Sequence, residues 1–180
     1  MNKLIFLLFL VVIIFGFWYY WVPVKETNMQ ISSEAFSEGG FIPPKYTCDG
    51  ENINPELSLA DIPKETKSLA LIMDDPDVPK NLRPDGLFVH WVMWNINPNT
   101  IRIEENSTPE EAAEGLNGAG RAGYTGPCPP DREHRYFFKI YALDTRLELP
   151  SNTDKNALER AIGGHIISSA ELMGRYDRKR

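Results

Sequence analysis

The sequence predicts a mainly β fold with an antiparallel core. Three apolar runs, residues 68–74, 87–96 and 135–143, have the length of buried strands and are rich in β-branched and aromatic side chains. Long connections dense in proline, glycine and asparagine separate these runs. A chain of 180 residues with these features favours one β domain that carries one or two helices near its end.

The N-terminal residues 1–24 are predicted to form a signal anchor, a transmembrane helix that precedes the β domain. Residues 4–22 are an unbroken apolar run, long enough as a helix to cross a hydrocarbon layer of about 30 Å. Lys3 lies on the short N-terminal side of this run. A positive charge there predicts a single-pass protein of the cell membrane, with a cytoplasmic N-terminus and an exported domain. Cleavage as a signal peptide, which would make the protein secreted, is the alternative. The bulky residues 18–23 offer no small-residue cleavage site.

The remainder is expected to consist of a short polar linker, residues 25–30, and one domain, residues 31–180. A first strand is expected within residues 31–37. Residues 41–59 are dense in turn-forming residues and are expected to be loop with short extended pieces.

A helix is predicted near the C-terminus. Thr153 or Asp154 can cap it, and apolar side chains within residues 158–173 fall on one broad helical face. The glycine pair at 163–164 indicates a break or a close packing contact in its middle.

The charge of the chain argues against one class of partner. The formal net charge is −6, whereas a nucleic-acid groove needs a clustered basic face. We therefore expect no nucleic-acid partner.

The two cysteines, Cys48 and Cys128, allow two interpretations. Neither belongs to a CxxC pair, which argues against a structural zinc site. In an oxidising compartment a Cys48–Cys128 disulfide is a fair hypothesis. Two buried, reduced cysteines are the alternative, and the sequence leaves both open.

Carboxylates follow one predicted strand, and a histidine lies inside the next. Asp75 and Asp77 belong to a proline-containing turn directly after an apolar run. His90 lies inside the next run, where strand alternation predicts that it shares a face with Phe88 and Val92.

A second histidine, His134, lies where a stiff loop rich in glycine and proline meets a strand. Tyr136 follows two residues later and is expected on the same face. Backbone N–H groups of such a loop cannot all pair in a sheet, which favours an anion receptor. An ordinary loop that enters a core strand is the other interpretation.

Together, Asp75, Asp77, His90 and His134 allow three kinds of site. A metal site lacks HxH or HExxH spacing, and no metal or cofactor is predicted. General acid–base catalysis lacks a GxSxG motif or a reactive-cysteine context. The third kind is a small anion pocket, in which imidazoles, a tyrosine hydroxyl and loop N–H groups receive phosphate or carboxylate oxygens. This kind of site requires the fewest sequence features.

Several motifs resemble the phosphatidylethanolamine-binding protein family. They are DDPDVP, FVHWVMWNI, GYTGPCPP and HRYFFKIYALD, together with YTCDG, SLALIMDDPD and GGHI…AELMGRY. They occur in the family's order and cover residues 31–176. The likeness is greatest to the bacterial and archaeal branch, the Raf-kinase-inhibitor-like proteins.

The resemblance implies a Greek-key β-sandwich of two antiparallel sheets with short peripheral helices, a C-terminal helix and a small anion cavity at one end. It implies a non-catalytic protein that binds ligands resembling phosphate or phospholipid head groups. By motif matching, the pocket residues would be Asp75, Asp77, Pro79, His90, Gly126, His134 and Tyr136.

Each pocket residue has an expected role. His90 and His134 would donate to the anion, so protonation would strengthen binding below about pH 6.5. Asp75 would fix an imidazole tautomer, Tyr136 would add a hydroxyl donor, and Gly126 would let backbone approach the ligand.

A protein-interaction module is the alternative function. Some members of the family inhibit proteases, and here exposed loops such as residues 81–84 would inhibit an extracellular hydrolase. The loop before His134 has the prokaryotic GPCPP form, so loop contacts of eukaryotic members do not transfer.

Overall fold

The computed structural model describes residues 28–178. The predicted anchor, residues 1–24, lies outside the described residues. Within 28–178, no helix has the length and apolar character needed to cross a membrane. This finding corrects the predicted single-pass location in the cell membrane.

The described chain forms eight strands, one α-helix and one short 3₁₀-helix. The strands are β1 (Gln30–Ser32), β2 (Leu57–Ala60), β3 (Ser68–Asp75), β4 (Phe88–Ile96), β5 (Arg102–Ile103), β6 (Ala113–Glu114), β7 (His134–Leu143) and β8 (Ile166–Tyr176). The helices are η1 (Pro44–Tyr46) and α2 (Lys155–Ile162).

The strands form two antiparallel sheets. The smaller has the order β1-β2-β5, and the larger has the order β6-β4-β3-β7-β8. Within the larger sheet, strands β3, β4, β6 and β7 lie in the spatial order β7-β3-β4-β6, with β7 returning beside β3; along the chain, β5 of the smaller sheet comes between β4 and β6. This is the order of a Greek key, as the resemblance implied.

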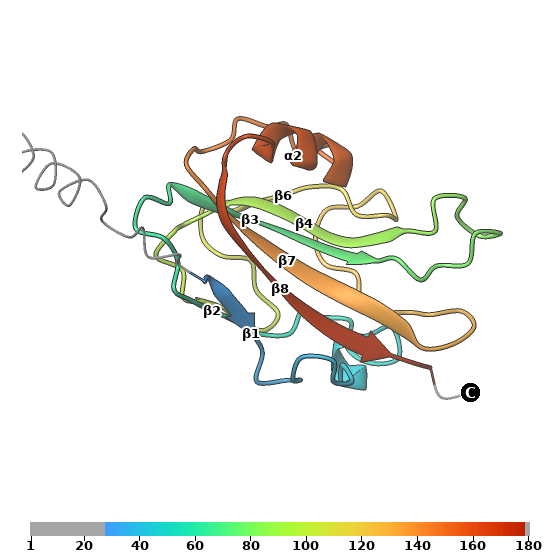
Figure 1. Ribbon diagram of the computed structural model, residues 1–180. Coiled ribbons are helices and arrows are strands. Elements are labelled where there is room, and N and C mark those ends of the chain that lie inside the picture. The colour runs from blue at the N-terminus through green and yellow to red at the C-terminus, as the bar shows by residue number, and fades with distance from the viewer. Residues whose placement is uncertain (1–27, 179–180) are drawn as a thin grey trace, which may run out of the picture.

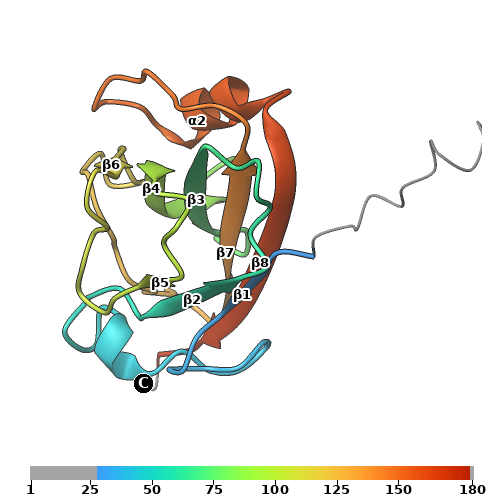
Figure 2. The same ribbon diagram turned by 90° about the vertical axis from the view of Figure 1, so that its left-hand side faces the viewer.

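The larger sheet lies between two other layers (Figures 1 and 2). On one face, the side chains of Leu71, Trp91 and Phe138 pack in a core that includes Leu57 and Ile103 of the smaller sheet. On the other face, Ile72, Val92 and Trp94 pack against Leu158 and Ile162 of α2 in a second core. Both faces of the central strands are therefore buried.

The three central strands agree closely with the apolar runs of the sequence. All eight residues of β3 are buried, as expected of an apolar run with cores on both faces. Strand β7 begins with an alternation in which Arg135 is exposed, whereas His134 and Tyr136 are buried. This alternation places His134 and Tyr136 on one face, as the sequence predicted.

The predicted C-terminal helix is wrong beyond residue 162. Asp154 caps α2 by accepting a hydrogen bond from the Ala157 N–H at 2.8 Å, and the helix ends before Gly164, whose φ is +84°. Residues 166–176 form β8, which pairs with β7 from Ile166 to Tyr176. Ten paired positions along β7 outweigh the helical spacing of the apolar side chains, because tertiary pairing overrides local pattern.

Candidate functional site

A cavity of about 360 Å³ lies at the end of the larger sheet where β3 ends and β4 begins. Loops that follow β3 and precede β7 complete its wall. The residues that line it are Asp75, Val78, Leu82, Arg83, Phe88, His90, Thr125, Gly126, Cys128 and Pro130. Asp75, His90 and Gly126 are the three sequence-predicted pocket residues among them.

A β-bulge turns His90 toward the cavity. Met73 pairs with Trp91 and Asp74 pairs with Val89, so β4 has one extra residue, His90, opposite this step of β3. His90 and Trp91 consequently lie on the same side of the sheet, where the His90 ring contacts Phe88 at a centroid distance of 4.8 Å. Val92 lies in the opposite core, so the expectation that His90 and Val92 share a face is wrong.

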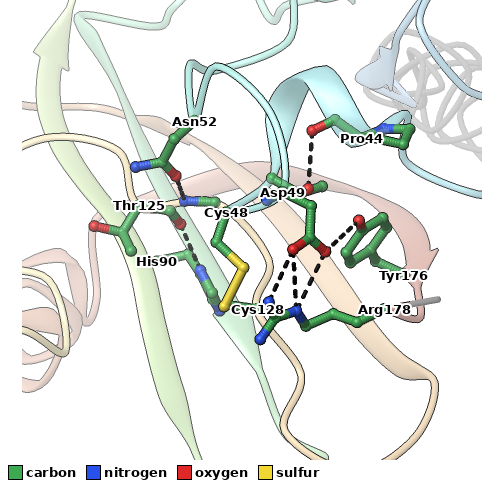
Figure 3. Close-up of a disulfide and its surroundings, with 11 residues drawn as sticks. Pro44, Cys48, Asp49, Asn52, His90, Thr125, Cys128, Tyr176 and Arg178 are labelled. Carbon is green, nitrogen blue, oxygen red and sulfur yellow. Dashed lines mark hydrogen bonds and ion pairs between the residues drawn. A yellow bond between two sulfur atoms is a disulfide. The ribbon is translucent and has the colours of Figure 1, made fainter. Parts of the chain in front are cut away.

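The His90 ring is held by one backbone hydrogen bond. Its Nδ1 lies 2.5 Å from the carbonyl oxygen of Thr125 (Figure 3). The side chain is buried, and burial lowers the pKa of the imidazole to about 4. The Nε2 atom is buried and has no hydrogen-bond partner among the described residues.

His134 lies behind the cavity wall and is fully buried at the start of β7. Its Nδ1 lies 2.7 Å from the Asp75 carboxylate, and its Nε2 lies 2.9 Å from the Asp131 carboxylate. Desolvation raises the pKa of the buried Asp75 carboxyl, whereas the hydrogen bond from His134 lowers that of Asp131. Both ring nitrogens of His134 are therefore engaged by protein carboxylates rather than directed at a ligand.

Asp77 and Pro79 shape the loop after β3 and are not among the residues that line the cavity. Asp77 accepts hydrogen bonds from the Arg135 guanidinium at 2.7 and 2.8 Å, and this contact lowers the pKa of its carboxyl. The Asp77 N–H donates to Asp75 at 2.8 Å. The Pro79 carbonyl accepts from the N–H groups of Leu82 and Arg83, two residues that do line the cavity.

Tyr136 lies deeper than the cavity lining. Its ring meets the His90 ring edge-on at a centroid distance of 5.2 Å. The side chain is fully buried, and its hydroxyl has no hydrogen-bond partner among the described residues. Burial raises the pKa of this hydroxyl, so Tyr136 is a neutral donor beneath His90.

Gly126 is required by packing of the loop that contains η1. A Cβ atom there would lie 2.5 Å from the Tyr46 carbonyl oxygen and 2.7 Å from Oδ1 of Asn52. The Gly126 N–H donates to that same Asn52 oxygen at 2.8 Å. The missing side chain therefore lets two protein loops approach each other, a role different from the close approach to a ligand that the sequence suggested.

A disulfide joins Cys48 to Cys128 beside the cavity (Figure 3). The Cys48 N–H also donates to the Pro127 carbonyl at 3.0 Å, so the two loops are linked twice. Cys128 lines the cavity. The disulfide thus holds part of the cavity wall against the η1 loop.

Arg83 is the cavity residue that the sequence analysis missed as a ligand-binding group. Its guanidinium lies over the Phe88 ring at 5.4 Å and donates to the Gly118 carbonyl at 3.2 Å. Among the residues that line the cavity it is the one with a permanent positive charge. The sequence placed residues 81–84 in an exposed loop, and nothing in the local pattern indicated that Arg83 lines the same cavity as His90.

The donor set does not suit a metal ion. Within residues 28–178, no group of three or more His, Cys, Asp or Glu side chains is arranged to hold one. The cysteine beside the cavity is bonded to sulfur and carries no thiolate. The chemistry left to the cavity is hydrogen bonding by His90, ion pairing by Arg83 and apolar contact with Val78, Leu82 and Phe88.

Comparisons with known proteins agree with this architecture. The family described as phosphatidylethanolamine-binding protein matches residues 32–177. A UPF0098 protein of Chlamydia muridarum is 50% identical over 149 residues, which cover 83% of this chain and 99% of that protein. A UPF0098 protein of Methanothermobacter thermautotrophicus is 46% identical over 155 residues, with the same two coverages.

Two solved structures share the fold. A putative phosphatidylethanolamine-binding protein homologue from Chlamydia trachomatis superposes with a TM-score of 0.82 at 48% identity, covering 85% of this chain and 99% of that one. YbcL of Escherichia coli, described as a member of the mammalian family of these proteins, gives a TM-score of 0.77 at 28% identity, covering 84% and 99%. With eight strands in two sheets and motifs in matching order, the chain belongs to the phosphatidylethanolamine-binding protein family, among its bacterial and archaeal members.

Proposed function

We propose that this protein binds a small ligand through a phosphate or carboxylate group in the cavity beside His90. One observation carries the proposal. His90, whose buried Nε2 has no hydrogen-bond partner among the described residues, and Arg83, which carries a guanidinium, line the same cavity. Buried polar atoms are normally hydrogen-bonded, so an unpartnered one in a cavity wall favours a ligand group opposite it. The family match supports a ligand-binding domain.

The charges around the cavity are compatible with one anionic group. Arg83 supplies a guanidinium that can pair with phosphate or carboxylate oxygens, and its Nε also lies 3.7 Å from the Asp85 carboxylate. Asp75 would repel an anion, but its carboxylate is turned to the His134 ring at 2.7 Å. Apolar contacts from Val78, Leu82 and Phe88 can take up the remainder of a small ligand.

Two roles expected from the sequence change in this proposal. His134 positions Asp75 rather than donating to the ligand, because both of its nitrogens face carboxylates. His90 keeps a neutral ring well below pH 6.5, because its pKa is lowered to about 4. The expected gain of binding below pH 6.5 through protonation of these histidines therefore has no support from the geometry.

Titration calorimetry on the full chain with inorganic phosphate and with acetate tests the proposal. Replacing Arg83 by Ala removes the cation, and we expect phosphate binding to weaken about tenfold or more, as for loss of a hydrogen bond to a charged group. Arg121→Ala is the matched control, because Arg121 is exposed and is not a lining residue. Equal phosphate affinity in the Arg83→Ala variant, or no heat with either anion, would contradict the proposal.

The hydrolase-inhibitor alternative and the expectation that the protein is not an enzyme remain predictions from the sequence. Absence of binding by any anion in calorimetry would favour the inhibitor function, with the exposed loop at residues 81–84 as its binding surface. In that case, inhibition of a hydrolase by the full chain, abolished by changes in this loop, would be the measurement to make.

A further inference from the structure

A second cavity, of about 760 Å³, lies beside η1 at the C-terminal end of β8. Its wall is mainly apolar and aromatic and carries two carboxylates. The lining residues are Phe41, Ile42, Pro43, Pro44, Asp49, Tyr176 and Asp177. None of them lines the cavity beside His90, so this is a separate site that the proposed function does not use.

The carboxylate of Asp49 belongs to a rigid turn. Cys48, directly before it, is bonded to Cys128. The Asp49 N–H donates to Oγ1 of Thr47 at 3.2 Å, and the Gly50 N–H donates to the Thr47 carbonyl at 3.1 Å. The carboxylate is therefore held in place before any ligand arrives, which lowers the entropy lost on binding.

The chain's own Arg178 shows which cation this carboxylate recognises. Its guanidinium donates through Nε and Nη2 to Oδ1 of Asp49, at 3.1 and 2.9 Å (Figure 3). The Tyr176 hydroxyl donates to Oδ2 at 2.8 Å. These hydrogen bonds lower the pKa of the Asp49 carboxyl, which is therefore charged at neutral pH. Donation through two nitrogens of one planar group is the geometry of arginine, and lysine cannot reproduce it.

Phe41 and two prolines supply apolar surface in the same cavity. The Phe41 side chain is 55% exposed, and the Arg175 guanidinium lies over its ring at 4.5 Å from the centroid. Pro43 has φ −58° and ψ 144°, the extended conformation of polyproline, and Pro44 follows it. Rigid surface of this kind can receive an apolar side chain at little cost in conformational entropy.

The charges around the cavity favour a basic ligand. Arg178 balances the charge of Asp49. Glu133 pairs with Arg175 at 3.1 Å. Asp177 is exposed and forms no ion pair within residues 28–178. One carboxylate of the lining therefore remains without a cation, which favours a basic partner over an acidic one.

We propose that this cavity binds an exposed arginine of a partner protein, whose guanidinium pairs with Asp49 and whose apolar neighbour packs on Phe41 and Pro44. In the free chain, Arg178 occupies the place of that guanidinium. The Arg178 side chain is 43% exposed, and an ion pair this close to the surface favours its paired state by no more than about fivefold. An incoming arginine that adds apolar contacts can therefore displace it.

Three short peptides that differ at one side chain test this proposal. They are acetyl-leucyl-arginyl-leucine amide and its analogues with citrulline or lysine at the centre. Citrulline has the shape of arginine without the charge, whereas lysine has the charge without the planar fork. In titration calorimetry on the full chain at low salt, we expect the arginine peptide to bind at least about fivefold more tightly than the citrulline peptide, with the lysine peptide between them. Equal affinities of the arginine and citrulline peptides, or no binding by any of the three, would overturn the proposal.

Arg178→Ala removes the guanidinium that occupies the site, so we expect the arginine peptide to bind about threefold to sixfold more tightly. Asp49 is then free in every molecule, whereas loss of a purely structural contact would leave the affinity unchanged or lower it. Arg146→Ala is the control, because Arg146 is exposed, pairs with Glu111 at 3.7 Å and does not line the cavity. Unchanged or weaker peptide binding in Arg178→Ala would contradict the proposed competition.

Asp49→Asn keeps the size of the side chain and removes its charge. We expect this variant to bind the arginine and citrulline peptides with affinities within about twofold of each other. Asp144→Asn is the control, because Asp144 is exposed, bonds His165 and does not line the cavity. If the Asp49 variant does not fold, the three peptides on the unchanged chain and the Arg178 variant still decide.

Sedimentation equilibrium separates a partner protein from a second copy of the chain as the occupant. We expect the unchanged chain to be a monomer in the absence of peptide. A dimer that dissociates in Arg178→Ala would place the C-terminal segment of a second copy in the cavity and overturn the proposal.

Discussion

The Asp75 carboxylate lies 2.7 Å from Nδ1 of His134, and this buried contact connects the wall of the cavity to the start of β7. The other oxygen of Asp75 accepts the N–H of Asp77, which shapes the turn after β3. Asp131, in the loop before β7, holds the second nitrogen of His134 at 2.9 Å. Two loops and two strands are thus joined through one imidazole. A polar side chain can be fully buried at position 134 because both of its ring nitrogens have partners.

Replacing His134 by Ala should destabilise the fold by about 3 kcal/mol, because the buried Asp75 carboxylate loses its charge-assisted partner. Urea denaturation at pH 7 measures this loss. His165→Ala is the control, since that exposed pair with Asp144 should contribute less than about 1 kcal/mol. Equal stability of the two variants would contradict a structural role for His134.

Loss of the disulfide should destabilise the chain by about 4 kcal/mol in the chain-entropy model, because the bridge closes a loop with a sequence separation of 80 residues. Cys48→Ser, Cys128→Ser and the double variant should lose the same amount, since each removes the same bond. Thermal or urea denaturation under oxidising conditions measures this. Losses that add in the double variant would show that the two cysteines act separately.

Gly126→Ala should destabilise the fold by about 1 to 3 kcal/mol, because the added methyl group overlaps the backbone of the η1 loop. Gly120→Ala is a useful comparison. A Cβ at Gly120 meets no atom within 4 Å, and its cost of about 1 kcal/mol comes from a φ of +72°. A smaller loss at Gly126 than at Gly120 in urea denaturation would contradict the close approach of the two loops.

The stability of the fold should fall as the pH is lowered from about 6.5 to 4. The pKa of His90 is lowered to about 4, below its ordinary value of 6.5, so within this window the unfolded chain binds the proton more readily than the folded chain. The difference corresponds to about 3 kcal/mol. The raised pKa of Asp75 acts in the opposite direction, but it is common to the unchanged protein and to His90→Phe. The loss of stability in this window should therefore be steeper in the unchanged protein, and parallel pH profiles would contradict a neutral His90.

Much of the fold could be predicted from local sequence. The runs that form β3, β4 and β7 lie within one residue of their predicted ends, because each packs in the core and carries a strong apolar signal. Strand β8 could not be predicted this way. Its apolar residues repeat at helical spacing. It is a strand because it pairs with β7, a segment that lies more than 20 residues earlier in the sequence.

The candidate site was only partly predictable, for similar reasons. Motifs identified Asp75, His90 and Gly126, which do line one cavity. The bulge at His90 depends on the register of two strands, so strand alternation alone gave it the wrong neighbour. Arg83 reaches the cavity through the fold of a loop that has no periodic signal.

The most direct test of the account is the state of the His90 ring, measured by long-range ¹H–¹⁵N NMR on the full chain at pH 7. The His90 signals are assigned by their absence in His90→Phe. We predict a neutral ring protonated at Nδ1, and a shift of the Nε2 signal when inorganic phosphate is added, with the Nδ1 proton retained. A ring protonated at Nε2 before phosphate is added, or His90 signals that stay unchanged at saturating phosphate, would contradict the account.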